Sequence, residues 1–155
     1  MGKPKGARRK VFIPQNVRFR PINVSDVEYR ARYAAGCNEI MEETKIHEIK
    51  ERIRANIEEP DYLGIVALHG ERRIGHVEGR IQGIQLMIED IYVVEAYRSR
   101  GIGRCLLESI ITLARDRGVT MVMFYTEPDN VPMQKIAKRL GFSLTRLYYE
   151  KRLAD

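Results

Sequence analysis

A glycine-containing turn is the part of this sequence best suited to bind a charged ligand. The segment Arg98-Ser99-Arg100-Gly101-Ile102-Gly103 stands where a predicted strand passes into a predicted helix. Glycine lets a ligand approach the backbone, and the first amides of a helix have no partner inside it and lie at the positive end of its dipole. Such a turn binds phosphate, and Arg98, Arg100 and Arg104 add positive charge. A tight strand-to-helix corner is the alternative explanation.

The residues around the glycines exclude the common nucleotide-binding motifs. A P-loop ends in Gly-Lys followed by Ser or Thr, whereas Gly103 is followed by Arg104 and Cys105. A dinucleotide fingerprint needs a third glycine, and Leu106 occupies that position. Cys105 is itself a candidate reactive thiol because helix N-termini lower thiol pKa values, although a small buried apolar residue is the commoner role of such a cysteine.

The turn must be positioned by the elements on either side of it. Leu86–Val94 has the pattern of a strand, and apolar residues then recur with helical spacing from Ile102 to Leu113 in a helix that ends at Gly118. Val119–Tyr125 follows as a short apolar strand of the kind buried in parallel sheets. The sequence therefore predicts a strand-turn-helix-strand unit around the glycines.

The remaining segments predict a sheet with helices on its faces. Ser25 and Glu28 have the spacing of a capping box, so a helix is expected from about Asp26 to Ala35. This order of elements predicts an α/β fold with a mixed central sheet and flanking helices, as one domain over residues 16–155 after a basic, disordered tail over residues 1–15. The other expected elements are the strands Val17–Ile22, Tyr62–Leu68, Arg72–Gln82 and Phe142–Leu153 and the helices Asn38–Glu59 and Val131–Leu140.

Composition narrows the class of protein. The net charge is +6 at pH 7, but Lys3, Lys5, Arg8, Arg9 and Lys10 supply five of these charges, so the rest of the chain is nearly neutral. This basic tail could bind nucleic acid, but no basic and aromatic motif accompanies it. A nucleic-acid partner is therefore an unfavoured alternative. Two cysteines and three scattered histidines predict no disulfide framework and no metal site.

No apolar run is long enough to span a bilayer, and no secretory signal opens the sequence, so we expect a cytoplasmic protein with no membrane partner.

Four segments together resemble the signature of the GNAT superfamily of N-acetyltransferases. R-S-R-G-I-G (98–103) is similar to the family's R/Q-x-x-G-x-G/A turn, and E-D-I-Y-V-V-E-A-Y (89–97) precedes it. The strand V-T-M-V-M-F-Y (119–125) and the helix N-V-P-M-Q-K-I-A-K-R-L-G-F (130–142) complete the match. The resemblance runs from about Val17 to Leu153. It implies the GNAT (acyl-CoA N-acyltransferase) fold and acetyl-CoA as co-substrate.

The resemblance also assigns residues to acetyl-CoA. The amides of the turn would hold the pyrophosphate, and the pantetheine arm would lie along the splayed edge of the preceding strand, where the Val93 amide would hold the acetyl carbonyl oxygen. Asn130 would touch the pantetheine from the other side, although an N-cap is an equally suitable role for it. The full set implied is Ile91, Tyr92, Val93, Arg98, Ser99, Arg100, Gly101, Ile102, Gly103, Arg104, Asn130 and Met133.

Two catalytic residues follow from the same resemblance. E-D-I-Y-V is similar to diamine and polyamine acetyltransferases, in which a glutamate at the position of Glu89 helps accept the proton of the amine, and Asp90 could bind a cationic acceptor. Strand alternation would put these two carboxylates on opposite faces unless a bulge intervenes, and a structural pair between Glu89 and an arginine is the alternative. Tyr125 is the second candidate. Its pKa near 10 makes tyrosine a poor base, so ordering a water or packing are its alternatives.

One departure from the family pattern concerns the acid that protonates the leaving thiolate. Many members carry a tyrosine seven residues after the asparagine, where this chain has Ala137. This leaves water, the amine proton or a side chain such as Tyr148 or Tyr149 as the source, and it supports a non-catalytic acetyl-CoA-binding module as the alternative function. The Met133 and Ala137 pattern resembles certain protein-lysine acetyltransferases, which conflicts with the polyamine resemblance. We therefore expect the acceptor to be a protein lysine, a protein N-terminus or a polyamine, and a homodimer by analogy alone.

Overall fold

The computed structural model describes residues 13–36 and 43–153. They belong to two compact units, one that ends at Tyr125 and one that begins at Thr126. The first unit holds the sheet and three of the four α-helices, and the second holds the last helix. The predicted tail lies mostly outside the described residues.

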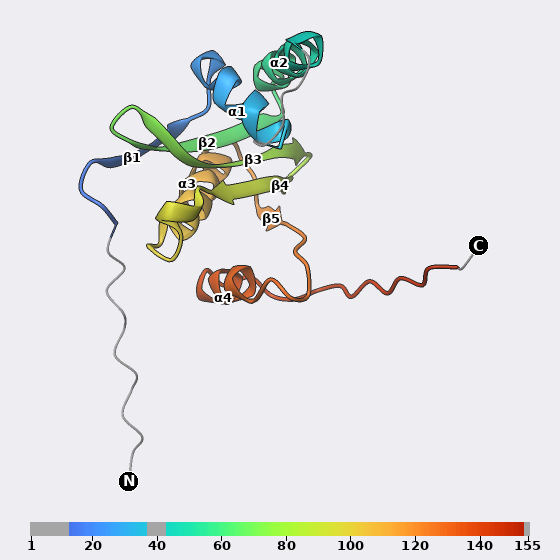
Figure 1. Cartoon of the computed structure of the whole chain (residues 1–155). Coiled ribbons are helices and arrows are strands. Elements are labelled where there is room, and N and C mark those ends of the chain that lie inside the picture. Colours follow the sequence, from blue (N-terminus) through green and yellow to red (C-terminus); the bar gives the residue numbers. More distant parts are fainter. Residues whose placement is uncertain (1–12, 37–42, 154–155) are drawn as a thin grey trace. The chain divides into compact units, whose positions relative to one another are not determined.

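One five-stranded mixed sheet organises the first unit (Figure 1). The four N-terminal strands are antiparallel neighbours, and the fifth runs parallel to the fourth. The mixed sheet with flanking helices predicted from the sequence is confirmed. In spatial order the strands are β1 (Val17–Pro21), β2 (Tyr62–His69), β3 (Arg72–Gln82), β4 (Gln85–Val93) and β5 (Met121–Met123).

Helices cover both faces of this sheet. α1 (Val27–Ala34) and α2 (Glu43–Glu58) pack together over one face, and α3 (Ile102–Asp116) covers the other (Figure 1). The short 3-10 turns η1 (Val24–Asp26) and η2 (Glu95–Tyr97) precede α1 and α3. α3 buries the stripe that its spacing predicts, and each such Leu or Ile contributes about 1.5–3 kcal/mol. Its buried residues are Ile102, Leu106, Leu107, Ile110 and Ala114.

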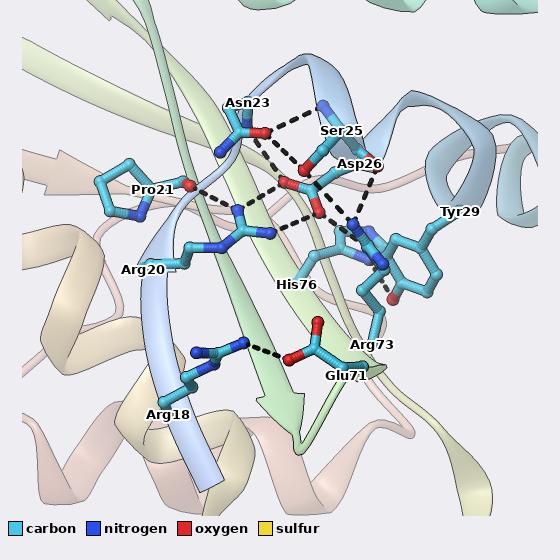
Figure 2. A network of polar contacts seen from close by, with 10 residues as sticks. All are labelled: Arg18, Arg20, Pro21, Asn23, Ser25, Asp26, Tyr29, Glu71, Arg73 and His76. Carbon is cyan, nitrogen blue, oxygen red and sulfur yellow. Dashed lines mark hydrogen bonds and ion pairs between the residues drawn. The ribbon is translucent and has the colours of Figure 1, made fainter.

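The start of α1 differs from the predicted capping box. The capping box lies one turn earlier, with Asn23 as the N-cap of η1: its Oδ1 accepts from the Ser25 amide (2.9 Å), and Asp26 Oδ2 accepts from the Asn23 amide (3.0 Å). Asp26 is drawn inward because Arg20 binds both its oxygens (2.7 and 2.9 Å) and Arg73 Nε donates to Oδ1 (2.8 Å), as Figure 2 shows. These ion pairs hold the Asp26 side chain inward and so determine where the capping box forms.

A bulge interrupts the pairing of β3 with β4. Glu78 lies opposite Asp90 and Gly79 opposite Ile88, so Glu89 is an extra residue in β4. Gly79 permits this close approach, because a Cβ atom there would collide with the carbonyl oxygen of Met87. The bulge lies directly before the carboxylate Asp90, in the strand that leads to the glycine turn.

The second unit contains α4 (Val131–Arg139) but not the predicted strand Phe142–Leu153. Alternating apolar residues give this segment the pattern of a strand, yet a strand also needs a neighbour to receive its ladder hydrogen bonds. Within the described residues, 142–153 join no ladder. The first residues of the predicted helix Asn38–Glu59 lie outside the described ranges, and the helices that are described include none long and apolar enough to cross a membrane.

Candidate active site

The glycine turn presents a row of backbone amides. Gly101 adopts the left-handed conformation (φ 84°) as the N-cap of α3, and Ser99 does so before it (φ 60°). The first amide to enter the helical ladder is that of Cys105, which donates to the Gly101 carbonyl (3.0 Å). In the described part of the chain, no backbone carbonyl accepts from the amides of Ser99 to Arg104. The turn therefore has the free donors that an anion needs.

The three arginines of the turn differ in their surroundings. Arg98 donates from Nε to the Val93 carbonyl (2.9 Å), and its guanidinium lies over the Tyr92 ring, 5.6 Å from the centroid. Arg100 lies over the Tyr97 ring (5.8 Å). Arg104 instead pairs with Glu108 one helical turn away (2.9 Å). Arg98 and Arg100, each held against an aromatic ring, therefore supply more of the net positive charge of the turn than Arg104.

The edge of β4 is open beside this turn. Among the described residues, β5 pairs only with Gln85, Leu86 and Met87. Val94 donates its amide to Ile74 of β3 (2.8 Å), and successive amides of a strand point to opposite sides. The amides of Val93 and Ile91 therefore point away from β3, toward the side that β5 leaves unpaired.

The bulge puts Glu89 and Asp90 on the same face of the sheet. Gly75 of β3 faces Leu106 of α3. Because successive residues of a strand point to opposite faces, His76 and Glu78 point to the other face, which α1 and α2 cover. Asp90 lies opposite Glu78 on that face, and Glu89 joins Ile53 of α2 in lining a small pocket there. The exception that the sequence left open, a bulge between the two carboxylates, is what the structure contains.

Glu89 lies at the exposed side of this face. Its side chain is 49% exposed, and Oε1 is 3.7 Å from Arg80 Nε. Arg80 makes shorter contacts elsewhere, with Asp61 Oδ1 (3.1 Å) and Asn56 Oδ1 (2.9 Å). The pairing with an arginine that the sequence offered as the alternative is thus present but loose, and it leaves the Glu89 carboxylate accessible.

Asp90 belongs to a tighter cluster with a buried histidine. His76 is 0% exposed, and its Nε2 lies 2.9 Å from Asp90 Oδ2 while its Nδ1 lies 2.9 Å from Tyr29 Oη. Tyr33 donates to Asp90 Oδ1 (3.2 Å), and its ring packs edge-on against the imidazole. The Asp90 side chain itself is 27% exposed. One surface of this carboxylate therefore remains open.

Burial and hydrogen bonds set the charges in this cluster. Burial alone would raise the pKa of Asp90, but hydrogen bonding from His76 and the positive charge of Arg30 outweigh it, so its pKa lies below the ordinary value. Burial lowers the pKa of His76 more than Asp90 raises it. Burial and the neighbouring Asp90 raise the pKa of Tyr33 to about 12. At neutral pH the cluster therefore holds a carboxylate, a neutral imidazole and an intact phenol.

Around Glu89 and Asp90 the described residues include more carboxylates than cations. Arg30, which is almost fully buried, pairs with Glu78 through Nη2 and Nε (the latter 3.3 Å) and lies 3.7 Å from Asp90. Tyr62 also donates to Glu78 (2.9 Å). Two guanidinium groups thus face four carboxylates, and the surplus is negative, which suits a cationic ligand. The guanidinium groups are those of Arg30 and Arg80, and the carboxylates are those of Asp61, Glu78, Glu89 and Asp90.

The other predicted site residues are placed as follows. Tyr125 lies two residues beyond β5, and its side chain is exposed. In the second unit Asn130 is the N-cap of α4, where its side chain accepts from the Met133 amide (3.3 Å). Ala137 lies two turns into the same helix. Burial raises the pKa of Cys105, so the reactive thiol considered from its helix position is not favoured.

Sequence reasoning missed His76, Arg30 and Tyr33. The three histidines were treated as scattered because no metal spacing joins them. The sequence does contain two local patterns. Tyr29 and Tyr33 are four residues apart and so share one face of a helix, and His76 and Glu78 are two residues apart and so share one face of a strand. What the pattern lacked was the pairing of that helix face with that strand.

Comparisons with known proteins agree on one family. A sequence model of the acetyltransferase (GNAT) family matches residues 29–142. A mycothiol acetyltransferase of Corynebacterium aurimucosum is 41% identical over 58 residues, which are 36% of this chain and 19% of that protein. An aminoglycoside N(6')-acetyltransferase of Salmonella typhimurium is 28% identical over 82 residues, 52% of this chain and 57% of that protein. This chain thus spans well under two thirds of either relative.

Solved structures show the same fold over nearly the whole chain. An aminoglycoside N-acetyltransferase in complex with CoA has a TM-score of 0.71 at 18% identity, covering 92% of this chain and 100% of that one. A protein described as a transcriptional regulator from Bacillus halodurans has a TM-score of 0.73 at 19% identity, covering 88% and 99%. Identity at this level establishes the architecture and leaves the acceptor open.

Proposed function

Because this chain belongs to the acetyltransferase (GNAT) family, we propose that it transfers the acetyl group of acetyl-CoA to a primary amine by direct attack. The observation that carries the proposal is the open edge of β4 leading into the amides of the glycine turn. These two features supply donors for an extended amide-containing arm and for a pyrophosphate at its end. The family uses acetyl-CoA as its co-substrate.

The chain offers a fitting set of groups for acetyl-CoA. The amides from Ser99 to Arg104 would bind the pyrophosphate, with Arg98 and Arg100 neutralising its charge. The outward amides of Ile91 and Val93 would bind the pantetheine arm, and that of Val93 would stabilise the oxyanion that forms as the amine attacks. Asn130 and Met133 remain predictions, and the N-cap role of Asn130 is compatible with a contact through its remaining amide group.

In the proposed reaction Glu89 accepts a proton from the attacking amine. A lysine-like amine has a pKa of about 10.4, so it must lose a proton before its lone pair can attack. The amine nitrogen then bonds to the acetyl carbon, the carbon-sulfur bond breaks, and the thiolate takes up a proton. Ala137 provides no acid. We therefore propose that the thiolate takes its proton from water or receives the proton that the amine released. Tyr125 remains the weaker candidate for assisting either transfer.

We propose a cationic small-molecule amine as the acceptor. The negative surplus around Asp90 and Glu89 supports a substrate that carries more than one ammonium group. Polyamines fit this description, as do the aminoglycosides for which one relative is named. A protein lysine or N-terminus is the other class expected from the sequence. The cytoplasmic location and a homodimer stay predictions.

The test is acetyl transfer followed by mass spectrometry, with acetyl-CoA and a panel of spermidine, kanamycin and a lysine-containing peptide. Glu89→Gln is expected to lower kcat about a hundredfold by removing the base. Glu71→Gln is the matched control, because Glu71 lies in the exposed β2–β3 turn and forms a surface ion pair with Arg18 of β1. Transfer that survives Glu89→Gln would reject Glu89 as the base. Binding of acetyl-CoA without transfer to any amine would instead support a non-catalytic binding module.

A further inference from the structure

His76 is a fully buried titratable group that the proposed chemistry does not use. It lies between Tyr29 of α1 and Asp90 of β4, 2.9 Å from each. Three tyrosine rings hold the imidazole plane: Tyr29 at 5.6 Å, Tyr33 at 4.7 Å and Tyr92 at 5.9 Å between centroids. A polar ring enclosed in this way has a fixed orientation, so the position of its proton determines what it does.

The contacts select one tautomer. Nε2 lies close to both Asp90 Oδ2 (2.9 Å) and Arg30 Nη1 (2.8 Å), and it cannot donate to the first and accept from the second at once. A bare nitrogen lone pair facing a carboxylate would be repelled, whereas an N–H there makes a charge-assisted hydrogen bond. Arg30 pairs with Glu78 through Nη2 and Nε, so only its Nη1 must turn away from the imidazole. The full charge of Asp90 therefore favours the proton on Nε2, and Nδ1 then accepts from the Tyr29 hydroxyl.

We propose that His76 is a positioning residue that holds the Asp90 carboxylate in place as the binding group for the ammonium of the acceptor. Asp90 sets the tautomer of His76 and Tyr29 is the partner of Nδ1, while His76 holds Asp90 Oδ2 and Tyr33 holds Asp90 Oδ1. The exposed part of Asp90 then has one orientation, on the face of the sheet that also carries the accessible Glu89. This inference rests on the proposed function, because it gives Asp90 a cationic acceptor to bind.

The same geometry argues against a proton-relay role for His76. A relay through this chain of hydrogen bonds would have to take a proton from Tyr29, and burial raises the pKa of that phenol far above neutrality. The charged groups facing the imidazole are Asp90 on β4, Arg30 on α1 and Glu78 on β3. Their opposing effects, together with burial, keep the ring neutral, so His76 donates a hydrogen bond without giving up the proton.

The first arm of the test is nuclear magnetic resonance of the full chain labelled with nitrogen-15. Long-range proton–nitrogen correlations report the tautomer of each histidine, and His76 is expected to be protonated on Nε2 at all values between pH 6 and 8. Tyr29→Phe removes the partner of Nδ1 and is expected to leave the proton on Nε2, because Asp90 sets the tautomer. A protonated Nδ1, or an imidazole that takes up a second proton in this range, would overturn the proposal. This arm needs no turnover.

The second arm is kinetic and uses whichever panel amine the chain acetylates fastest. His76→Leu is expected to raise the acceptor KM about tenfold, the usual size for one hydrogen bond to a charged group, with the acetyl-CoA KM unchanged. His76→Gln keeps an N–H donor and is expected to recover most of the loss. His47→Gln, at an exposed histidine of α2, is the control. Equal rises in both KM values, or no rescue by Gln, would show a merely structural role.

The two arms separate failure of the inference from failure of the proposed function. A panel in which no amine is acetylated contradicts the acetylation proposal, while the tautomer measurement still decides whether His76 donates to Asp90. Thermal unfolding of His76→Leu and His76→Gln is measured alongside. If His76→Leu is unfolded, Tyr29→Phe carries the kinetic test, with a rise of the acceptor KM of about threefold expected because the imidazole loses one of the two hydrogen bonds that orient it. An unchanged KM would overturn the proposal.

Discussion

Asp26 precedes α1 directly and Asp90 contacts it through Tyr33, and the surroundings of these two carboxylates differ in one decisive way. Asp26 is 0% exposed and is bound by Arg20, Arg73 and the Asn23 amide. Asp90 is bound by His76 and Tyr33, which are neutral, and keeps 27% of its side chain exposed. Around Asp26 the arginines exceed the carboxylates, whereas around Asp90 the carboxylates exceed the arginines. The first arrangement anchors α1, and the second leaves negative charge for a ligand.

The largest effect that would test this comparison is on stability. Asp26→Asn leaves Arg20 and Arg73 without their buried partner, so we expect the free energy of unfolding to fall by about 3–5 kcal/mol. Urea denaturation at pH 7 measures it. A fall below about 1 kcal/mol would remove the distinction between the anchoring and the open carboxylate.

The complementary change is Asp90→Asn, which should act on catalysis. Loss of a charge-assisted contact to the acceptor is expected to lower kcat/KM for the acceptor by about tenfold to a hundredfold. The KM for acetyl-CoA should stay within about twofold. Steady-state kinetics with varied amine and fixed acetyl-CoA give both values. A variant that loses stability as much as Asp26→Asn, with unchanged kinetics per folded molecule, would make the two sites equivalent.

The pH dependence of stability sharpens the comparison further. The folded pKa of His76 lies below the unfolded value of about 6.5, so below that pH the unfolded chain binds a proton that the folded chain refuses, and stability falls as the pH drops. Asp26 also has a lowered pKa, but its contribution is lost only below about pH 3.9. Urea midpoints from pH 7.5 to 5 should decline for the wild type and stay flatter for His76→Gln.

The smallest effect is expected at an exposed ion pair near the Asp26 site. Arg18 and Glu71 lie 3.0 Å apart, with side chains 59% and 92% exposed (Figure 2). Such pairs contribute about 0–1 kcal/mol. Glu71→Ala should therefore change the urea midpoint little and become neutral at high salt. A loss comparable with that of Asp26→Asn would show that burial is not what separates these contacts.

Much of the fold could be predicted because its signals are local. A period of two residues predicts β3, and a period of 3.6 residues predicts the apolar stripe of α3. The glycine turn is predicted by its glycines, which stand between a strand pattern and a helix pattern. Phe142–Leu153 has the alternation of a strand, but pairing depends on a partner elsewhere in the chain. The predicted capping box was wrong for a related reason: Arg20 and Arg73, distant in sequence from each other, bind Asp26, and the box forms one turn earlier, at the start of η1.

The candidate site was predictable in its cofactor half and much less so in its acceptor half. Ser99 to Arg104 form one continuous segment, whereas the cluster around Asp90 joins residues from α1, β3 and β4. Glu89 and Asp90 were proposed because E-D-I-Y-V resembles the diamine and polyamine acetyltransferases. Whether they share a face depended on one inserted residue and on Gly79 opposite it, which strand alternation does not specify.

Because of the bulge in β4, Glu89 could be deleted without changing the face of the other residues in the strand. If Glu89 were taken out of the chain, Ile88 would be followed directly by Asp90, and the strand would alternate regularly while Asp90 and Tyr92 kept their face. Removing Asp90 would restore the same alternation but lose that carboxylate, and removing a residue outside the bulge would turn other side chains to the opposite face. The proposed base is therefore an insertion into an otherwise ordinary strand. A one-residue deletion, which elsewhere in a sheet is among the most disruptive of changes, becomes here the cleanest way to subtract a single function.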